Sequence, residues 1–152
     1  MTMAMVDSAL DTIHVVKETM VAASAEIVFE SILEELGPAG QLPDGTPMMM
    51  KIEAWPGGRL WRDLGNNTGH FWGHVQVIKP PKILEICGPM FMSYPVVSHI
   101  QYRVTEEGGM CKLVLTHRAF GQIQAEHRDG VEKGWGMKLQ KAKEIAERRA
   151  KR

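Results

Sequence analysis

The sequence is poor in cysteine, which limits the covalent chemistry that the chain can offer. Cys87 and Cys111 lie in strand-like segments and form no CxxC pair. Buried, reduced thiols of a cytoplasmic protein are the simplest interpretation, because disulfides belong mainly to oxidising compartments. A redox pair stays open, since it would require the two strands to be neighbours with facing side chains.

An excess of charge of either sign is also absent. Eighteen basic residues balance 18 acidic ones in a chain of 152 residues, so no overall field attracts nucleic acid or anionic lipid. No apolar run approaches the roughly 20 residues of a membrane span. The N-terminal segment lacks the basic region followed by an apolar run that marks a signal peptide. We therefore expect a cytoplasmic protein with neither nucleic acid nor membrane as a partner.

Motifs for phosphate binding and nucleophilic catalysis are missing as well. There is no GxGxxG, GxxxxGK or GxSxG, and no Cys/His cluster with ligand spacing. His70 and His74, in GHFWGHVQVIKPP, would suit a metal if they lay on a helix. On a strand they are roughly 13 Å apart, which is too far to share a zinc ion. We expect no metal and no cofactor.

What the chain does contain is a regular succession of strand and helix signals. β-branched residues at 12–20 predict a strand, and residues 24–38 predict a helix that Ser24 caps and Gly37-Pro38 ends. Apolar and polar residues then alternate between short turns in the runs 48–55, 59–64, 70–78, 82–88, 96–104 and 111–120. Such runs indicate an antiparallel sheet.

The last 30 residues, 123–152, predict one long helix. Its apolar face carries Val131, Trp135, Leu139, Ala142 and Ala146 at helical spacing, and this face can cover one side of the sheet. The resulting class is α+β. We expect residues 1–11 to form a loose N-terminus and residues 12–152 to form a single domain.

Three glycines interrupt the predicted C-terminal helix, at Gly130, Gly134 and Gly136. Each costs about 1 kcal/mol relative to alanine in a helix interior. This cost predicts either that something packs closely against the helix there or that its first turns are irregular.

Several short motifs, in their order and spacing, resemble a known superfamily. They are AEIVFESI after the first strand, WPGGRLWR around a Gly-Gly turn, GHVQVIKPPKIL, KLVLTHRAF, and a late GW. Together, over about residues 13–146, they resemble the START-like (SRPBCC) superfamily, and within it the group related to activators of Hsp90 ATPase. The resemblance implies the helix-grip fold, a curved antiparallel sheet of about six to seven strands gripping a long C-terminal helix. It also implies an apolar cavity between sheet and helix.

Aromatic and methionine side chains are the strongest signal of a site. The chain has 11 methionines, and methionine suits irregular gaps and adaptable binding surfaces. A filled core would use the same residues and stays open. The ligand-binding residues that we expect to line the cavity are Trp61, Phe71, Met90, Met92, Tyr94, His117, Phe120, Trp135 and Leu139.

The polar candidates are histidines and one arginine. His117 shares a strand face with Leu113 and Leu115, so it should point inward. It is a weak catalytic candidate for proton transfer, and a core histidine with a hydrogen-bonded neighbour is the alternative. Alternation places His99 and Arg103 on the solvent face, although a curled sheet could turn them toward the cavity.

The stretch of residues 70–78 has two faces when it is read as a strand. Phe71, Gly73, Val75 and Val77 form the more apolar face and should point inward. His70, Trp72 and His74 should then point outward or toward a partner subunit.

The superfamily includes lipid and hormone binders, aromatic cyclases, hydrolases and co-chaperone-like proteins, so the fold does not determine the function. We expect a protein that binds a hydrophobic or aromatic small molecule in the cavity. The alternatives are a cyclase- or hydrolase-like enzyme that uses the same cavity, and a co-chaperone-like interaction protein. Exposed strand edges would suit a homodimer.

Overall fold

A computed structural model of the protein describes residues 9–152. The prediction of a loose N-terminus lies outside the described residues for positions 1–8, and the first strand already begins at Asp11. The elements are β1 (Asp11–Val21), α1 (Ala25–Glu35), β2 (Met50–Ile52), β3 (Arg59–Gly65), β4 (Thr68–Lys79), β5 (Ile83–Gly88), β6 (Val96–Glu107), β7 (Met110–Gly121) and α2 (Ala125–Ala150).

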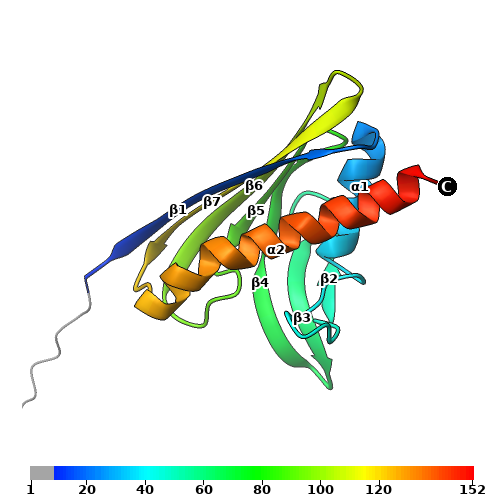
Figure 1. Ribbon diagram of the computed structural model, residues 1–152. Helices are drawn as coiled ribbons and strands as arrows, with labels where there is room; N and C mark the ends of the chain where they lie inside the picture. Colours follow the sequence, from blue (N-terminus) through cyan, green and yellow to red (C-terminus); the bar gives the residue numbers. More distant parts are fainter. Residues whose placement is uncertain (1–8) are drawn as a thin grey trace, which may run out of the picture.

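The α+β helix-grip arrangement is confirmed. One antiparallel sheet of seven strands, in the order β1-β7-β6-β5-β4-β3-β2, curves around the long helix α2, which crosses its concave face (Figure 1). α1 lies beside the second half of α2, where Arg149 pairs with Glu30 and Glu34. Two helices on one face leave the convex face of the sheet to solvent, as in many antiparallel sheets.

Strand alternation builds the core on the concave side. β6 and β7 pair along their whole length, from Val96 opposite Gly121 to Glu107 opposite Met110. Their inward residues include Ile100, Leu113 and Leu115, all fully buried. Residues at odd positions of β7 therefore face α2, and this puts His117 on the inner face as predicted.

A β-bulge interrupts the alternation where β3 meets β4. Leu60 pairs with Gly73, and the next residue, Trp61, pairs with Phe71. Trp72 is therefore an extra residue on β4, and such a residue changes the phase of the side chains on its strand.

The bulge overturns part of the prediction for residues 70–78. The alternation predicts that Trp72 faces outward with His70 and His74, but Trp72 is buried in the core. It also predicts that Phe71 faces inward, but Phe71 is 47% exposed. His70 and His74 are exposed, as predicted. Phase reversal at a bulge cannot be read from a pattern of period two, which assumes an uninterrupted ladder.

The predicted strand at 48–55 is mostly loop. Only Met50–Ile52 pairs with β3, and Met49 before it adopts a positive φ of 60°. A non-glycine residue in that region bends the chain out of the extended conformation. The segment between α1 and β2 is therefore a long loop that reaches α2, and this matters for the cavity.

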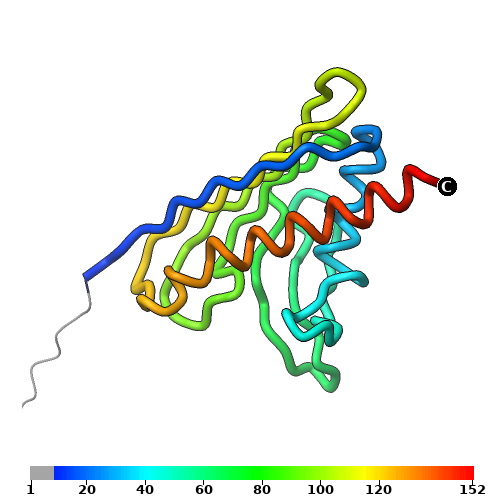
Figure 2. The backbone as a smooth tube through the Cα atoms, viewed as in Figure 1, coloured from blue at the N-terminus to red at the C-terminus, as the bar shows by residue number. Residues whose placement is uncertain are grey.

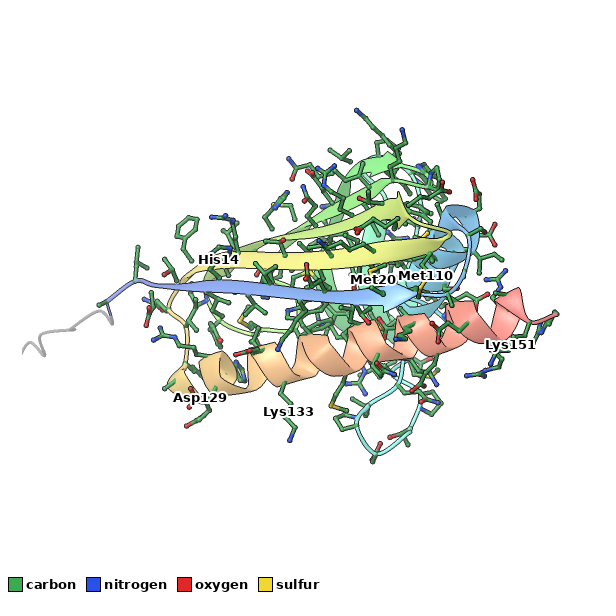
Figure 3. The ribbon with its side chains drawn as sticks, turned by 45° about the horizontal axis from the view of Figure 1, so that its top comes forward. His14, Met20, Met110, Asp129, Lys133 and Lys151 are labelled. Atoms are coloured by element: carbon green, nitrogen blue, oxygen red, sulfur yellow. The ribbon has the colours of Figure 1, made fainter. Side chains whose placement is uncertain are left out.

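α2 follows its predicted apolar face. Trp135, Leu139, Ala142 and Ala146 are buried, and Val131 packs partly buried against them. Lys133 points away from the sheet on the opposite side of the helix (Figure 3). Within residues 9–152, no helix is long and apolar enough to cross a bilayer.

The interpretation of the three helix glycines is wrong on both counts. α2 is regular from Ala125 onward, and a Cβ built on Gly130, Gly134 or Gly136 would meet no atom within 4 Å. Nothing packs closely there. The glycines instead leave space beside the helix.

The two cysteines do not meet. Cys87 is on β5 and Cys111 is on β7, with β6 between them, and both are free thiols. A redox pair between neighbouring strands is therefore excluded by the strand order.

Candidate ligand cavity

A cavity of about 310 Å³ lies between the first half of α2 and two loops. One loop joins α1 to β2, and the other, residues 89–95, joins β5 to β6. Figure 2 traces both loops along the backbone. The lining residues are Gln41, Pro43, Met48, Met90, Phe91, Met92, His117, Glu126, His127, Gly130, Val131, Gly134, Trp135, Met137 and Lys138.

Aromatic rings in series form one wall of the cavity. The Phe91 ring lies edge-on to Trp72, with centroids 4.8 Å apart, and contacts Trp135 at 5.5 Å. Edge-to-face packing of this kind adds to the energy of burial. The wall therefore ties loop 89–95 to both β4 and α2.

The backbone of Met90 sets the position of this wall. Met90 has a positive φ of 55°, and its N–H donates to the carbonyl oxygen of Trp72 at 2.8 Å. The left-handed conformation is costly for methionine, and burial of its side chain offsets that cost. Met92 and Met48 complete a flexible, polarisable surface.

His117 forms the polar floor, and both of its ring nitrogens are occupied. The Trp135 indole N–H donates to His117 Nδ1 at 2.7 Å. Indole is only a donor, so Nδ1 carries no proton and Nε2–H donates to Ser98 Oγ at 3.0 Å. Burial lowers the pKa of His117 from 6.5 to about 4. The imidazole is therefore neutral, with one defined tautomer.

A buried ion pair stands at the other end of the cavity. Lys138 Nζ lies 2.9 Å from Glu35 Oε2, and the side chains are 11% and 4% exposed. Burial raises the pKa of Glu35 above its ordinary value, although Lys138 acts in the opposite direction. The pair connects α1 to α2 and places one ammonium group on the cavity wall.

The rim is closed on one side by a contact between loop 89–95 and α2. The Tyr94 hydroxyl and His127 Nδ1 are 2.8 Å apart, and their rings stack with centroids 5.3 Å apart. Gly130 and Gly134 lie one turn apart on α2 and line the cavity. Because they have no side chains, the helix surface stays open there.

Four of the nine predicted ligand residues line this cavity: Met90, Met92, His117 and Trp135. Tyr94 lies at its rim through His127. Leu139 is buried in the core one turn beyond Trp135 on α2 and does not line the cavity.

The other three predicted residues lie elsewhere. Trp61 and Phe71 border a separate hollow along the β3–β4 hairpin, where the Arg59 guanidinium stacks on the Trp61 ring at 4.2 Å. Phe120 is 55% exposed on the convex face, since it follows the inward Ala119 on β7. Their large aromatic rings favour a cavity, but the direction in which each side chain leaves its strand takes it away from this one.

His99 and Arg103 lie on the convex face of the sheet, as the alternation along β6 predicts, and the curvature of the sheet does not turn them toward the cavity. Arg103 is exposed, and His99 Nε2 lies 3.2 Å from Glu85 Oε1. A hydrogen bond from Gln101, with help from His99, lowers the pKa of Glu85. Neither residue reaches the cavity.

Sequence reasoning missed several residues of the site, which include Lys138 and its partner Glu35, Phe91, Glu126, His127, Met137, and the loop residues Gln41, Pro43 and Met48. The sequence does contain a signal for Lys138 and Glu35. Lys138 falls three residues after Trp135 on the buried face of α2, and Glu35 falls three after Ile32 on the apolar stripe of α1. A charge on an otherwise apolar face indicates a buried partner.

Acidic and metal-binding side chains do not cluster in the part of the chain that the structure describes. No group of three or more His, Cys, Asp or Glu side chains there could hold a metal ion.

No protein-family model matches the chain, and a search of the curated proteins finds no match. Solved structures do match its fold. An uncharacterised protein from Rhizobium leguminosarum has a TM-score of 0.71 at 16% identity, over 92% of this chain and 97% of that one. CalU16 from Micromonospora echinospora has a TM-score of 0.60 at 18% identity, over 91% and 87%.

A third similar structure is the di-domain ARO/CYC StfQ from the steffimycin biosynthetic pathway. It has a TM-score of 0.65 at 13% identity, over 93% of this chain and 52% of StfQ. At these identities the likeness establishes the helix-grip fold alone.

Proposed function

We propose that the protein binds an apolar or aromatic small molecule in the cavity between α2 and the loops before β2 and β6. The observation that carries this proposal is a space of about 310 Å³ lined by methionines and aromatic rings. Sites for small molecules are concave and mainly apolar, with a few polar groups that fix the orientation of the ligand. The volume of this cavity lies at the lower end of the range for such sites. Similarity in fold to the ARO/CYC StfQ is consistent with such a role.

The glycines of α2 support the same function. Gly130 and Gly134 line the cavity, and a Cβ on either would meet open space. Alanine would favour the helix by about 1 kcal/mol at each position. Their presence at this cost is consistent with a need for free volume at the cavity rim.

Displacement of a neutral fluorescent probe tests the proposal. N-phenyl-1-naphthylamine should bind the protein with a rise in fluorescence, and apolar ligands should displace it. Gly134→Leu places a side chain in the cavity rim and should weaken probe binding at least tenfold. Gly136→Leu is the matched control, because Gly136 lies on the same helix, also has open space around it, and does not line the cavity.

Equal loss of probe binding in both variants, or none in either, would place the probe elsewhere. Circular dichroism of each variant shows whether α2 is intact. Failure of the probe and of a library of apolar compounds to bind or to shift the melting temperature would contradict the proposed function.

A binding role accounts for His117 better than proton transfer does. Both ring nitrogens already have partners, so general acid or base catalysis would require one of these bonds to break first. The cyclase- or hydrolase-like enzyme stays a prediction, and turnover of a ligand that falls in His117→Gln would favour it.

A co-chaperone role, a cytoplasmic location and a homodimer stay predictions from the sequence. The similarity to the group related to Hsp90 ATPase activators, with its co-chaperone role, rests on the sequence motifs. The cytoplasmic location rests on composition. The homodimer rests on β1, which is an edge strand of the sheet in the described part of the chain. Light scattering would test it.

A further inference from the structure

Two charged side chains meet beside a cavity that is lined mainly by apolar residues. Lys138 and Glu35 are nearly inaccessible, and their closest atoms are 2.9 Å apart. Removing two charges from water costs about as much as their attraction returns, so apolar residues would stabilise the same position as well or better. The pair is therefore better explained by recognition than by stability.

The ammonium group of Lys138 has donors to spare. It carries three N–H groups, and among residues 9–152 Glu35 is the one strong acceptor that it meets. Its other neighbours are the thioether of Met50, at 3.9 Å, and the face of the Phe91 ring, at 5.3 Å. Both are weak partners. An oxygen atom in the cavity would replace them with a normal hydrogen bond.

The charge of the site selects among oxygen acceptors. Lys138 is already balanced by Glu35, so a ligand carboxylate would add an uncompensated negative charge close to a buried carboxylate. A carbonyl oxygen accepts the same hydrogen bond without adding charge. Glu126, the acid among the lining residues, is exposed and would also repel a ligand carboxylate.

We propose that Lys138, held by Glu35, is the polar anchor of the cavity, and that its ligand is a neutral aromatic molecule with a carbonyl oxygen. This inference rests on the proposed function and goes beyond it by naming the ligand class. Phe91 and Lys138 line the cavity side by side. A ring that packs on Phe91 and Trp135 thus directs its carbonyl group toward the ammonium group.

The charges around Glu35 also include Lys141. Burial raises the pKa of the Glu35 carboxyl group, and Lys138 and, more weakly, Lys141 oppose that rise. Lys141 does not line the cavity, so Lys138, which is already paired with Glu35, is the lysine that a ligand there would meet.

Three bicyclic probes of similar shape test the anchor by isothermal titration: 2-acetylnaphthalene, 2-ethylnaphthalene and 2-naphthoate. The wild-type protein should bind the ketone about tenfold more tightly than the hydrocarbon, as expected for one hydrogen bond from a charged donor. It should also bind the ketone more tightly than the carboxylate.

Variants separate the anchor from general effects on the cavity. Lys138→Met should abolish the preference for the ketone over the hydrocarbon. Glu35→Gln leaves the lysine charge unbalanced, so it should reverse the ranking and favour 2-naphthoate. Lys133→Met is the control, because Lys133 is exposed on the outer side of the same helix, and it should change nothing.

The outcomes distinguish this inference from the proposed function. If no probe binds the wild-type protein, both are overturned. If the probes bind but the ketone and hydrocarbon are equal, or the preference survives in Lys138→Met, the anchor alone is overturned. Tighter binding of 2-naphthoate to the wild type would contradict a neutral ligand. Should Lys138→Met fail to fold, the reversal in Glu35→Gln decides.

Discussion

At the scale of single residues, His117 couples the stability of the fold to pH. The imidazole is 1% exposed, and its folded-state pKa is about 4 instead of 6.5. The unfolded chain therefore binds more protons between these values. Stability should be complete above pH 6.5, fall as the pH drops from 6.5 to 4, and change no further below that range. The loss should be about 3 kcal/mol.

Chemical denaturation at a series of pH values measures this loss. Carboxyl groups also titrate near pH 4, so the contribution of His117 must be separated from theirs. His117→Gln is the reference, because its amide can accept from Trp135 and donate to Ser98 without titrating. The difference in unfolding free energy between the two proteins should change as the pH falls from 6.5 to 4 and stay constant outside that range. Parallel curves across this range would mean that His117 does not resist protonation.

Trp135 belongs to the same hydrogen-bond network, together with His117 and Ser98. Trp135→Phe keeps most of the buried ring but removes the donor to His117 Nδ1. A buried acceptor without its partner costs about 1–3 kcal/mol, so the midpoint of urea unfolding should fall accordingly.

The pH dependence of Trp135→Phe provides a check that simple loss of packing would not reproduce. Without the indole donor, His117 Nδ1 is free to take a proton, so the acid-sensitive range should move toward pH 6.5. An unchanged pH profile would contradict the network and leave packing as the only role of the ring.

At the scale of elements, α2 combines a buried apolar face with glycines that leave space at the cavity rim. Gly134→Ala and Gly136→Ala should each raise the free energy of unfolding by about 0.5–1 kcal/mol, because alanine is the better helix former and a Cβ meets no atom within 4 Å at either site. Of the two variants, Gly134→Ala alone should weaken binding of a cavity ligand, since Gly134 lines the cavity and Gly136 does not. Thermal unfolding and probe titration measure the two effects separately.

Stabilisation by both alanines with no difference in ligand affinity would mean that the free space at Gly134 has no functional role. Destabilisation by either would contradict the open space beside the helix.

The elements themselves could largely be predicted from sequence, because their signals are local. Ser24 caps α1 by accepting from the Ile27 N–H, as its position before the apolar stripe indicates. The failures come from non-local causes. The bulge at Trp72 depends on how β4 pairs with β3, and the loss of most of the strand at 48–55 depends on Met49 leaving the extended region.

At the scale of the whole molecule, the cavity joins four segments that are far apart in the chain: residues 41–48, residues 90–92, His117 on β7 and the first half of α2. No local pattern links Gln41 to Lys138, so the sequence could not place these loops against the helix. Trp135 could be placed because it lies on a long periodic helix. Phe71 and Phe120 could not, because their faces depend on the phase of whole strands.

This layout makes a ligand in the cavity a bridge between distant segments, and hydrogen exchange can detect it. Saturation with a cavity ligand should slow amide exchange in residues 41–48, in residues 89–95 and in the first half of α2. The reason is that the bound ligand contacts all three segments and so opposes their local unfolding. The β6–β7 turn near Gly108, far from the cavity along the sheet (Figure 1), should be unaffected and serves as the internal control. Protection confined to residues 59–71 would instead move the site to the hollow along the β3–β4 hairpin, beside Trp61 and Phe71.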